Sequence, residues 1–423
     1  MTPQAGRTDR KFSNAAWLTS GALPRLLTVL DCEGEEARAV GGAVRNALLG
    51  VPVLEVDVAT TAVPDEVVKR VTAAGFKAVP TGIEHGTVTV TVVIDKYPFE
   101  VTTLRKDVET FGRHAKVEFG RDWKSDAERR DFTINALSVT RDGIVYDYAG
   151  GLDDLAHRRV RFIGDPAKRI EEDYLRILRF FRFHAAYSAG HPDAAGLAAC
   201  IAARKGLDQL SRERVRMEIL KLLVTPHATA TLAVMAHAGL LLLVLGGVPY
   251  LADFENVAKV EAATGATPDA VRRLGALGVV IAEDAERLWQ KLRLTNNEHE
   301  RLASMAEGWR RISPVFGETG ARALLYRLGP QDFTDHALLG WARSAANAHD
   351  AKWHELATLP QRWTAPEFPL KAADFMKRGV AQGPALGTAL AAAERAWIAA
   401  GFTQERRALD DIADTAAKSA ASS

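Results

Sequence analysis

The most informative segment reads Gly41-Gly42-Ala43-Val44-Arg45-Asn46-Ala47-Leu48-Leu49-Gly50 and, shortly after, Val53-Leu54-Glu55-Val56-Asp57-Val58-Ala59-Thr60. A strand over 53–60 alternates its side chains, so Glu55 and Asp57 share one face while Val56 and Val58 face the core. Two neighbouring carboxylates can hold Mg²⁺, and two such ions can clamp the attacking and leaving oxygens of a phosphoryl transfer. Because glycine lets backbone approach a triphosphate, the segment predicts metal-dependent nucleotide transfer; a plain turn before a half-exposed strand is the alternative.

Two further motifs follow at domain-scale spacing. Arg129-Arg130-Asp131 precedes the apolar run 132–137, and Glu172-Asp173-Tyr174-Leu175-Arg176 opens a helix predicted over 172–182. In that helix Asp173 and Arg176 are neighbours on one face, with Arg179 further round. Arginine offers only donors and aspartate only acceptors, so a rigid pair can match the Watson-Crick edge of cytosine or adenine. An ordinary surface ion pair is the alternative interpretation.

Together, the three motifs resemble those of the tRNA nucleotidyltransferase and bacterial poly(A) polymerase family, the class II branch of the polymerase-β-like nucleotidyltransferases. The resemblance implies an α+β head followed by an elongated all-α neck, body and tail. It also implies template-independent addition of CCA to the 3′ end of tRNA from CTP and ATP, with Mg²⁺ as cofactor. Segments 292–298 and 383–387 resemble the carboxy-terminal half of α-proteobacterial members.

The resemblance also implies roles for individual residues. Glu55 and Asp57 are the catalytic metal ligands; Gly42, Arg45 and Arg130 hold phosphates; Asp131 reads the ribose; Asp173 and Arg176 read the base, with Arg179 beside them. Glu100 is either a third metal carboxylate or an exposed strand residue. The polar segment 106–128 is implied to be the flexible loop that helps the enzyme change from adding C to adding A. Glu55 and Asn46 depart from the family, which usually has aspartate at both places.

Segment patterns predict the domain organisation. Short β-rich runs at 53–60, 87–94, 99–104 and 143–148, with a helix from Pro64 to Val71, indicate an α+β head over 1–150. The pattern then becomes helical, and with the resemblance this predicts a base-recognising neck over 151–224 and an all-α tRNA-binding body and tail over 225–415. The alanine- and serine-rich end, 416–423, is predicted to be disordered.

Composition narrows the class of protein. Among 423 residues, 54 Lys and Arg balance 53 Asp and Glu, so an RNA-binding surface must be local. Two distant cysteines indicate neither disulfides nor a zinc site. The polar amino terminus does not resemble a secretory signal, and the apolar run 239–248 is too short to cross a membrane. We therefore expect a cytoplasmic protein; the sequence does not indicate an oligomeric state.

Three rival functions remain open at this point. A poly(A) polymerase uses the same head motifs, but the stretch 80–88 resembles the CCA-adding version, and the chain lacks a basic carboxy-terminal extension. An enzyme that adds only C or only A, and a non-catalytic RNA-binding protein with an altered Glu55, are the others. His349-Asp350 with His354 also resembles part of a His-Asp metal phosphohydrolase site, but an amphipathic helix is the favoured interpretation there.

Overall fold

The computed structural model describes residues 6–12, 15–81, 89–95, 97–111 and 114–421. Two compact units divide the chain, Met1–Val244 and Leu245–Ser423. No helix among the described residues is both long enough and apolar enough to span a membrane. The sequence-predicted limits at 150, 224 and 415 differ from this division and remain predictions.

An eight-stranded mixed sheet forms the centre of the first unit, in the order β1-β10-β9-β2-β3-β6-β5-β4. Its strands are β1 (Arg7–Lys11), β2 (Ala37–Val40), β3 (Asp57–Thr60), β4 (Lys77–Thr81), β5 (Thr89–Ile94), β6 (Tyr97–Thr103), β9 (Leu137–Thr140) and β10 (Ile144–Asp147). β3 and β6 run parallel, and Asp57 is in register with Glu100. The strand predictions near 87–94, 99–104 and 143–148 are thus confirmed within a few residues.

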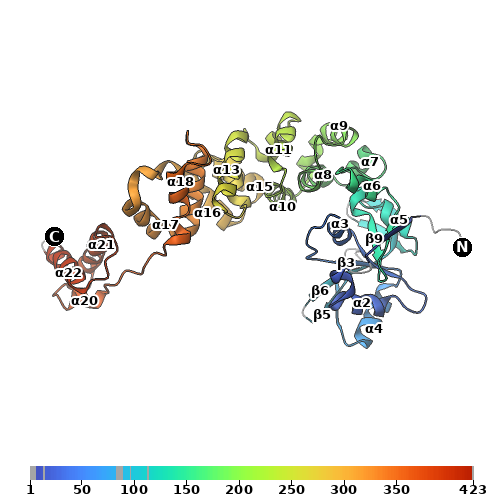
Figure 1. Cartoon of the computed structure of the whole chain (residues 1–423), viewed down its shortest axis with the longest axis horizontal. Helices are drawn as coiled ribbons and strands as arrows, with labels where there is room; N and C mark the ends of the chain where they lie inside the picture. Colours follow the sequence, from blue (N-terminus) through green and yellow to red (C-terminus); the bar gives the residue numbers. More distant parts are fainter. Residues whose placement is uncertain (1–5, 13–14, 82–88, 96, 112–113, 422–423) are drawn as a thin grey trace. The chain divides into compact units, whose positions relative to one another are not determined.

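Helices α2 and α4 pack against each other and against the sheet (Figure 1). The first unit contains α1 (Ala16–Thr19), α2 (Ala22–Leu30), α3 (Gly42–Leu48), α4 (Pro64–Ala73), α5 (Trp123–Glu128), α6 (Gly151–Ala156), α7 (Pro166–Glu172), α8 (Leu175–Tyr187), α9 (Ala194–Ala202), α10 (Arg212–Leu223) and α11 (Ala228–His237). α4 begins at Pro64 with acids in its first turn and buries Val67 and Val71, as its sequence predicts. Helix α12 (Leu240–Leu245) spans the boundary between the two units.

The second unit is all-α in its described residues. Its helices are α13 (Leu251–Thr264), α14 (Ala270–Gly278), α15 (Ala282–Leu292), α16 (Asn296–Gly308), α17 (Gly317–Ala342), α18 (Ala351–Ala357), α19 (Leu359–Arg362), α20 (Ala372–Met376), α21 (Pro384–Ala399) and α22 (Arg406–Ala421). Inside it, buried Asp335 accepts hydrogen bonds from Arg272 and Arg301. The α+β class of the first unit, followed by helices, confirms the predicted fold class.

Two structural predictions for segments outside the candidate site are wrong. The segment 106–128 is not a loop: β7 (Arg105–Phe111) pairs with β8 (His114–Phe119), and α5 follows. Strand pairing satisfies backbone groups whatever the side chains are, so polar composition alone does not indicate a loop. Asp122 then caps α5 by accepting from the backbone N–H of Lys124 and of Ser125.

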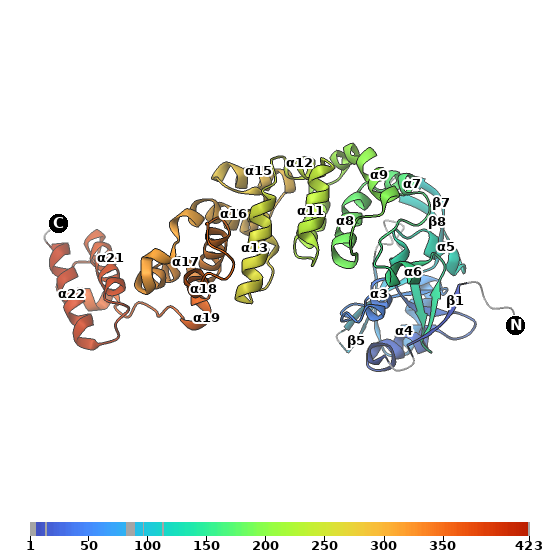
Figure 2. The same ribbon diagram turned by 45° about the horizontal axis from the view of Figure 1, so that its top comes forward.

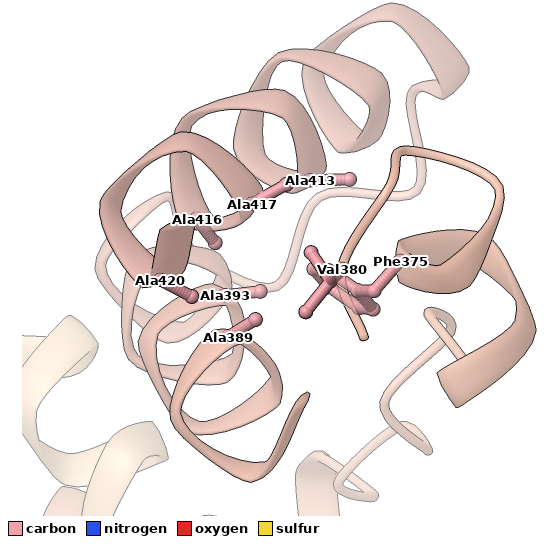
Figure 3. Packing of buried hydrophobic residues seen from close by; sticks show 8 residues of the cluster. All are labelled: Phe375, Val380, Ala389, Ala393, Ala413, Ala416, Ala417 and Ala420. Carbon is pink, nitrogen blue, oxygen red and sulfur yellow. The ribbon is translucent and has the colours of Figure 1, made fainter. Parts of the chain in front are cut away.

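The predicted disordered tail is also wrong for residues 416–421, which continue α22. Helices α21 and α22 lie side by side (Figure 2). Figure 3 shows their contact, in which small side chains face one another and the short helix α20 closes one end; its buried members are Phe375, Val380, Ala389, Ala393, Ala413, Ala416, Ala417 and Ala420. Alanines spaced three and four residues apart form one helix face. The segment therefore buries an apolar surface that its alanine- and serine-rich composition does not indicate.

Candidate active site

An open polar pocket of about 870 Å³ lies in the first unit and gathers the predicted site residues. Its lining comes from Gly41, Gly42, Arg45, Glu55, Asp57, Glu100, Arg130, Asp131, Asn135, Asp173, Leu175, Arg176, Arg179, Arg182, Phe183, Arg214 and Lys221. Three motifs far apart in the sequence therefore share one pocket. Its volume suits a ligand of nucleotide size.

The glycine turn leads from β2 into α3 at one wall of the pocket. Gly41 has a φ of 66° and a ψ of −119°, a backbone conformation that side chains disfavour. A Cβ atom at Gly41 would lie 3.2 Å from Nη1 of Arg130. The turn therefore requires glycine, and a side chain here would also crowd the guanidinium of Arg130.

Three carboxylates occupy the end of the pocket formed by β3 and β6. Asp57 begins β3, and Glu100 is its register partner on β6. Glu55 is exposed in the segment before β3, so the predicted strand over 53–60 is wrong at its start. Partial burial, then the charge of Glu100 and that of Glu55, raise the pKa of Asp57 above its ordinary value, against the opposing effect of Arg130.

This acidic end fits a divalent cation. Repulsion among the carboxylates is what a bound cation would relieve, and carboxylate oxygens are the ligands that Mg²⁺ prefers. Among the residues that the structure describes, no three His, Cys, Asp or Glu side chains converge into a ready-made metal cage. Mg²⁺ commonly keeps several waters and takes further ligands from substrate phosphates, so one or two of these carboxylates suffice.

Arg45 is more deeply buried than a phosphate ligand on a surface would be. Its guanidinium donates to Oδ1 of Asn135 (2.5 Å), to Oδ1 of Asn46 (3.0 Å) and to the hydroxyl of Tyr187 (2.8 Å). Burial lowers the pKa of Arg45, although Tyr187 opposes the shift. The structure therefore places Arg45 as a bridge between α3, the segment at Asn135, and α8, with one edge in the pocket.

Arg130 and Asp131 lie on a short segment that α7 holds in place. Arg130 donates to the carboxylate of Asp126, which is a residue of α5. Arg169 of α7 donates to the backbone carbonyls of Arg129 and Arg130, the latter at 2.6 Å. Sequence reasoning missed Arg169; its place three residues before Glu172 is the only local signal.

The carboxylate of Asp131 is fully engaged. Oδ1 accepts from the backbone N–H of Phe132 (2.8 Å) and from the amide of Asn135 (3.0 Å), and Oδ2 accepts from Nε (2.8 Å) and Nη2 (2.5 Å) of Arg179. Burial alone would raise the pKa of Asp131, but the charge of Arg179 and these hydrogen bonds hold it below its ordinary value. Asp131 is therefore an ionised, buried partner of Arg179.

Asp173 and Arg176 both line the pocket, but not as the predicted helical pair. α7 ends at Glu172 and α8 begins at Leu175, with Asp173 extended between them at φ −158° and ψ 107°. Asp173 accepts from the N–H of Leu175 (3.1 Å) and from Arg214 (2.6 Å). Arg176 donates to Glu172 (2.5 Å) and to the carbonyl of Arg169 (2.6 Å). Each of the two has its own partner.

One face of α10 completes the pocket, and sequence reasoning missed it. Its residues belong to none of the three sequence motifs. In the structure Arg214 pairs with Asp173, and buried Glu218 accepts from Arg182 of α8 at 2.5 Å. Arg214, Glu218 and Lys221 recur at helical spacing, a signal that could have indicated a shared face.

Two other sequence-based expectations, for the segment at Asp350 and for the stretch 80–88, can be compared with the structure. Asp350 caps α18 by accepting from the backbone N–H of Lys352 and of Trp353, which favours the helical interpretation over a phosphohydrolase site. Residues 82–88 of the stretch that resembles the CCA-adding version lie outside the described residues.

Comparison with known proteins agrees with the three motifs. Residues 37–161 match the model of the poly A polymerase head domain, and residues 193–254 match that of the probable RNA and SrmB-binding site of polymerase A. Among solved structures, the Bacillus stearothermophilus CCA-adding enzyme in complex with CTP aligns with a TM-score of 0.71 at 26% identity, covering 95% of this chain and 98% of the other. The Thermotoga maritima CCA-adding enzyme complexed with tRNA shares the fold, with a TM-score of 0.68 at 17% identity over 96% and 100% of the chains.

Curated relatives extend the likeness over most of the chain. The mitochondrial CCA tRNA nucleotidyltransferase 1 of Mus musculus is 33% identical over 92% of this chain and 89% of the relative. The CCA-adding enzyme of Limosilactobacillus fermentum is 32% identical over 86% of this chain and 89% of the relative. With the motifs gathered in one pocket, these matches show that the chain belongs to the class II family of tRNA nucleotidyltransferases and bacterial poly(A) polymerases.

Proposed function

We propose that this chain adds C, C and A to the 3′ end of tRNA without a nucleic-acid template, using CTP and ATP. The observation that carries the proposal is the single pocket that joins the carboxylates of β3 and β6 to Arg130, Asp173 and Arg176. Relatives that are named CCA-adding enzymes or CCA tRNA nucleotidyltransferases, and solved structures of such enzymes with CTP or tRNA, support it.

The acidic end is where we place the transfer chemistry. Enzymes of this family generally use a divalent metal, and for this chain we propose Mg²⁺ held by Asp57 and Glu55, with Glu100 as a third carboxylate. When bound, Mg²⁺ would supply positive charge to the attacking 3′-hydroxyl and to the pyrophosphate that leaves. Arg130, next to Gly41 and in electrostatic reach of Asp57, would orient the triphosphate.

Base selection falls to Asp173 and Arg176. Each carboxylate has about four acceptor positions, and Asp173 uses two of them, so it can still accept from the exocyclic amine of cytosine or adenine. Arg176 uses Nη1 for Glu172 and for the carbonyl of Arg169, which leaves its other N–H groups to donate to a ring nitrogen or carbonyl. The contacts to Arg214 and Glu172 fix where these groups point.

The contacts of the other predicted nucleotide-binding residues limit what each of them can bind. Asp131 already accepts four hydrogen bonds, so a ribose hydroxyl would have to replace one of them. Arg179 then acts beside it as the partner that keeps Asp131 ionised. Gly42 and Arg45 would contact phosphates only along the edge that they present to the pocket.

We also propose that the chain is of the α-proteobacterial type and is located in the cytoplasm. Segments 292–298 and 383–387 support the first proposal, and the presence of only two, distant cysteines supports the second. The relatives from mouse and human are named as mitochondrial enzymes, so the compartment of this chain has to be measured by fractionation or imaging.

Extension of a tRNA that ends at its discriminator base tests the function. The purified protein with Mg²⁺ is given CTP alone, ATP alone or both, and product length is read at single-nucleotide resolution. We expect two additions with CTP and three with both nucleotides. A long ladder with ATP alone would identify a poly(A) polymerase, addition of only C or only A would identify a partial enzyme, and no extension would favour the non-catalytic alternative.

A further inference from the structure

The cations of the pocket differ in whether a protein side chain accepts a hydrogen bond from them. Seven Lys and Arg side chains line it. Six of them, Arg45, Arg130, Arg176, Arg179, Arg182 and Arg214, donate to side-chain acceptors that the structure describes. The side chain of Lys221 makes no hydrogen bond or ion pair with any described residue, although it lines the same pocket.

Lys221 lies on the face of α10 that serves the pocket. It follows Arg214 by seven residues, two helical turns or about 10 Å along the axis, and returns to almost the same face. Glu218 lies between them and holds Arg182 of α8, and α10 packs along α8 (Figure 1). The position of Lys221 is therefore set by a braced helix, while its ammonium group is exposed.

The proposed triphosphate site is formed by other elements of the pocket. Asp57, Arg130 and Gly41 lie together there. Two routes join these residues to Glu218 of α10: Asp131 pairs with Arg179, which lies near Glu218, and Arg45 of the glycine turn lies near Arg182, which pairs with Glu218. Lys221 shares its helix with Arg214, the partner of Asp173, and not with the residues that we assign to the triphosphate.

We propose that Lys221 binds a backbone phosphate of the RNA strand that is being extended. The inference rests on the proposed function, because it assumes that a tRNA 3′ end enters this pocket. A compact ammonium group on a flexible stem suits a phosphate whose position shifts as the strand grows by one nucleotide, whereas the forked arginines hold fixed partners. The uncompensated carboxylates and the uncompensated lysine mark where the protein leaves charge for cation and RNA respectively.

A structural role for Lys221 is the alternative to exclude. Lys221 is in the last turn of α10, where a cation favours the helix dipole. That role would change thermal stability and leave the dependence of RNA binding on salt unaltered. The two interpretations therefore differ in a measurable slope.

The experiment compares K221Q and K221R with wild type and with the control K69Q. Lys69 is an exposed lysine of α4 that does not line the pocket, so K69Q removes the same charge elsewhere. For each protein, the KM for tRNA and the KM for CTP and ATP are measured across a series of salt concentrations, together with the Tm. We expect K221Q to raise the KM for tRNA about fivefold and to flatten the salt slope of log kcat/KM by about 0.7, the loss of one single-strand phosphate contact.

The same variants separate every outcome. We expect unchanged KM values for CTP and ATP in K221Q, rescue in K221R and wild-type behaviour in K69Q. An unchanged salt slope in K221Q overturns the proposal, and a higher KM for CTP and ATP assigns Lys221 to the triphosphate instead. Failure of the wild-type protein to extend tRNA would overturn the proposed function itself, so extension by the wild-type protein is measured first.

Discussion

The acidic end of the pocket and its base-reading end hold their charges in opposite ways. At the acidic end, Glu55, Asp57 and Glu100 have no hydrogen-bonded or ion-paired side-chain partner among the described residues. Desolvation first, and then the charges of Glu100 and Glu55, raise the pKa of Asp57. At the base-reading end, Asp131 and Asp173 each accept from an arginine. The same residue type is thus unsatisfied in one place and neutralised in the other.

This difference separates two ways of preparing a site. Paired carboxylates are fixed before the substrate arrives, because their arginines hold them in one orientation and lower the cost of ordering them later. Unpaired carboxylates keep a local negative charge that a cation must compensate. We infer that the base-reading end is organised by the protein, whereas the acidic end is completed by its ligands.

Replacing Asp57 should have the largest effect. In D57N the carboxylate in register with Glu100 and with Val40, the residue before the glycine turn, is lost. Several kcal/mol of metal-assisted stabilisation are lost with it, so transfer should fall by at least about a thousandfold. Nucleotide incorporation in single-turnover assays measures this, and tRNA affinity serves as the control because the RNA-binding surface is unchanged. Activity within tenfold of wild type would mean that the acidic end does not hold the catalytic metal.

Breaking a paired carboxylate should instead cost stability. In D131N the amide would oppose the N–H groups of Arg179, and the free energy of unfolding should fall by about 2 to 3 kcal/mol. Chemical denaturation measures it. The double variant D131N/R179M should be less destabilised than the sum of its single variants, since removing both partners leaves no unpaired charge; simple additivity would contradict the pairing.

The pH dependence of this cost has a defined sign. Because the folded pKa of Asp131 is depressed, its stabilisation is present above the unfolded value, about 3.9, and is lost as pH falls through the folded value. The difference between wild type and D131N should therefore be constant near neutrality and shrink below about pH 4.

Local sequence signals predicted what depends on local structure. Pro64 and the acids after it set the start of α4, and Val67 and Val71 set its buried face. The three motifs also identified most of the pocket's residues. The start of β3 could not be read in this way, because its pairing with β2 stops where Asp57 meets Val40 and the next residue, Gly41, turns away from the sheet.

Ion-pair partners that are far apart in the sequence could not be predicted either, because no local signal indicates them. Asp173 meets Arg214 41 residues later, and Asp131 meets Arg179 48 residues later. Asp173 and Arg176, three apart, instead looked like a pair because helical spacing was the only geometry available. The tail at 416–421 shows a further limit, since alanines become a core only when another alanine face is opposite them.

Replacing Gly41 in the glycine turn should have a smaller effect, on nucleotide binding. In G41A the backbone would be strained by about 1 to 3 kcal/mol, and the new methyl group would press on Arg130. We expect the KM for CTP and ATP to rise about tenfold, since 1.4 kcal/mol is a factor of ten in affinity. The matched control is G50A, which has a similar φ of 69° but no atom within 4 Å of the added Cβ. Equal KM changes in both variants would show that strain alone is responsible.

Shortening Glu55 should have the smallest effect and tests whether this unusual ligand is adaptable. Glu55 is exposed in the segment before β3, so its backbone can shift to keep a carboxylate near the metal. E55D should therefore keep kcat within about threefold and move mainly the Mg²⁺ concentration for half-maximal activity, whereas E55Q should lose about tenfold. If E55Q matches wild type at every Mg²⁺ concentration, the cation is held by Asp57 and Glu100 across the parallel strands, and Glu55 is only a neighbouring charge.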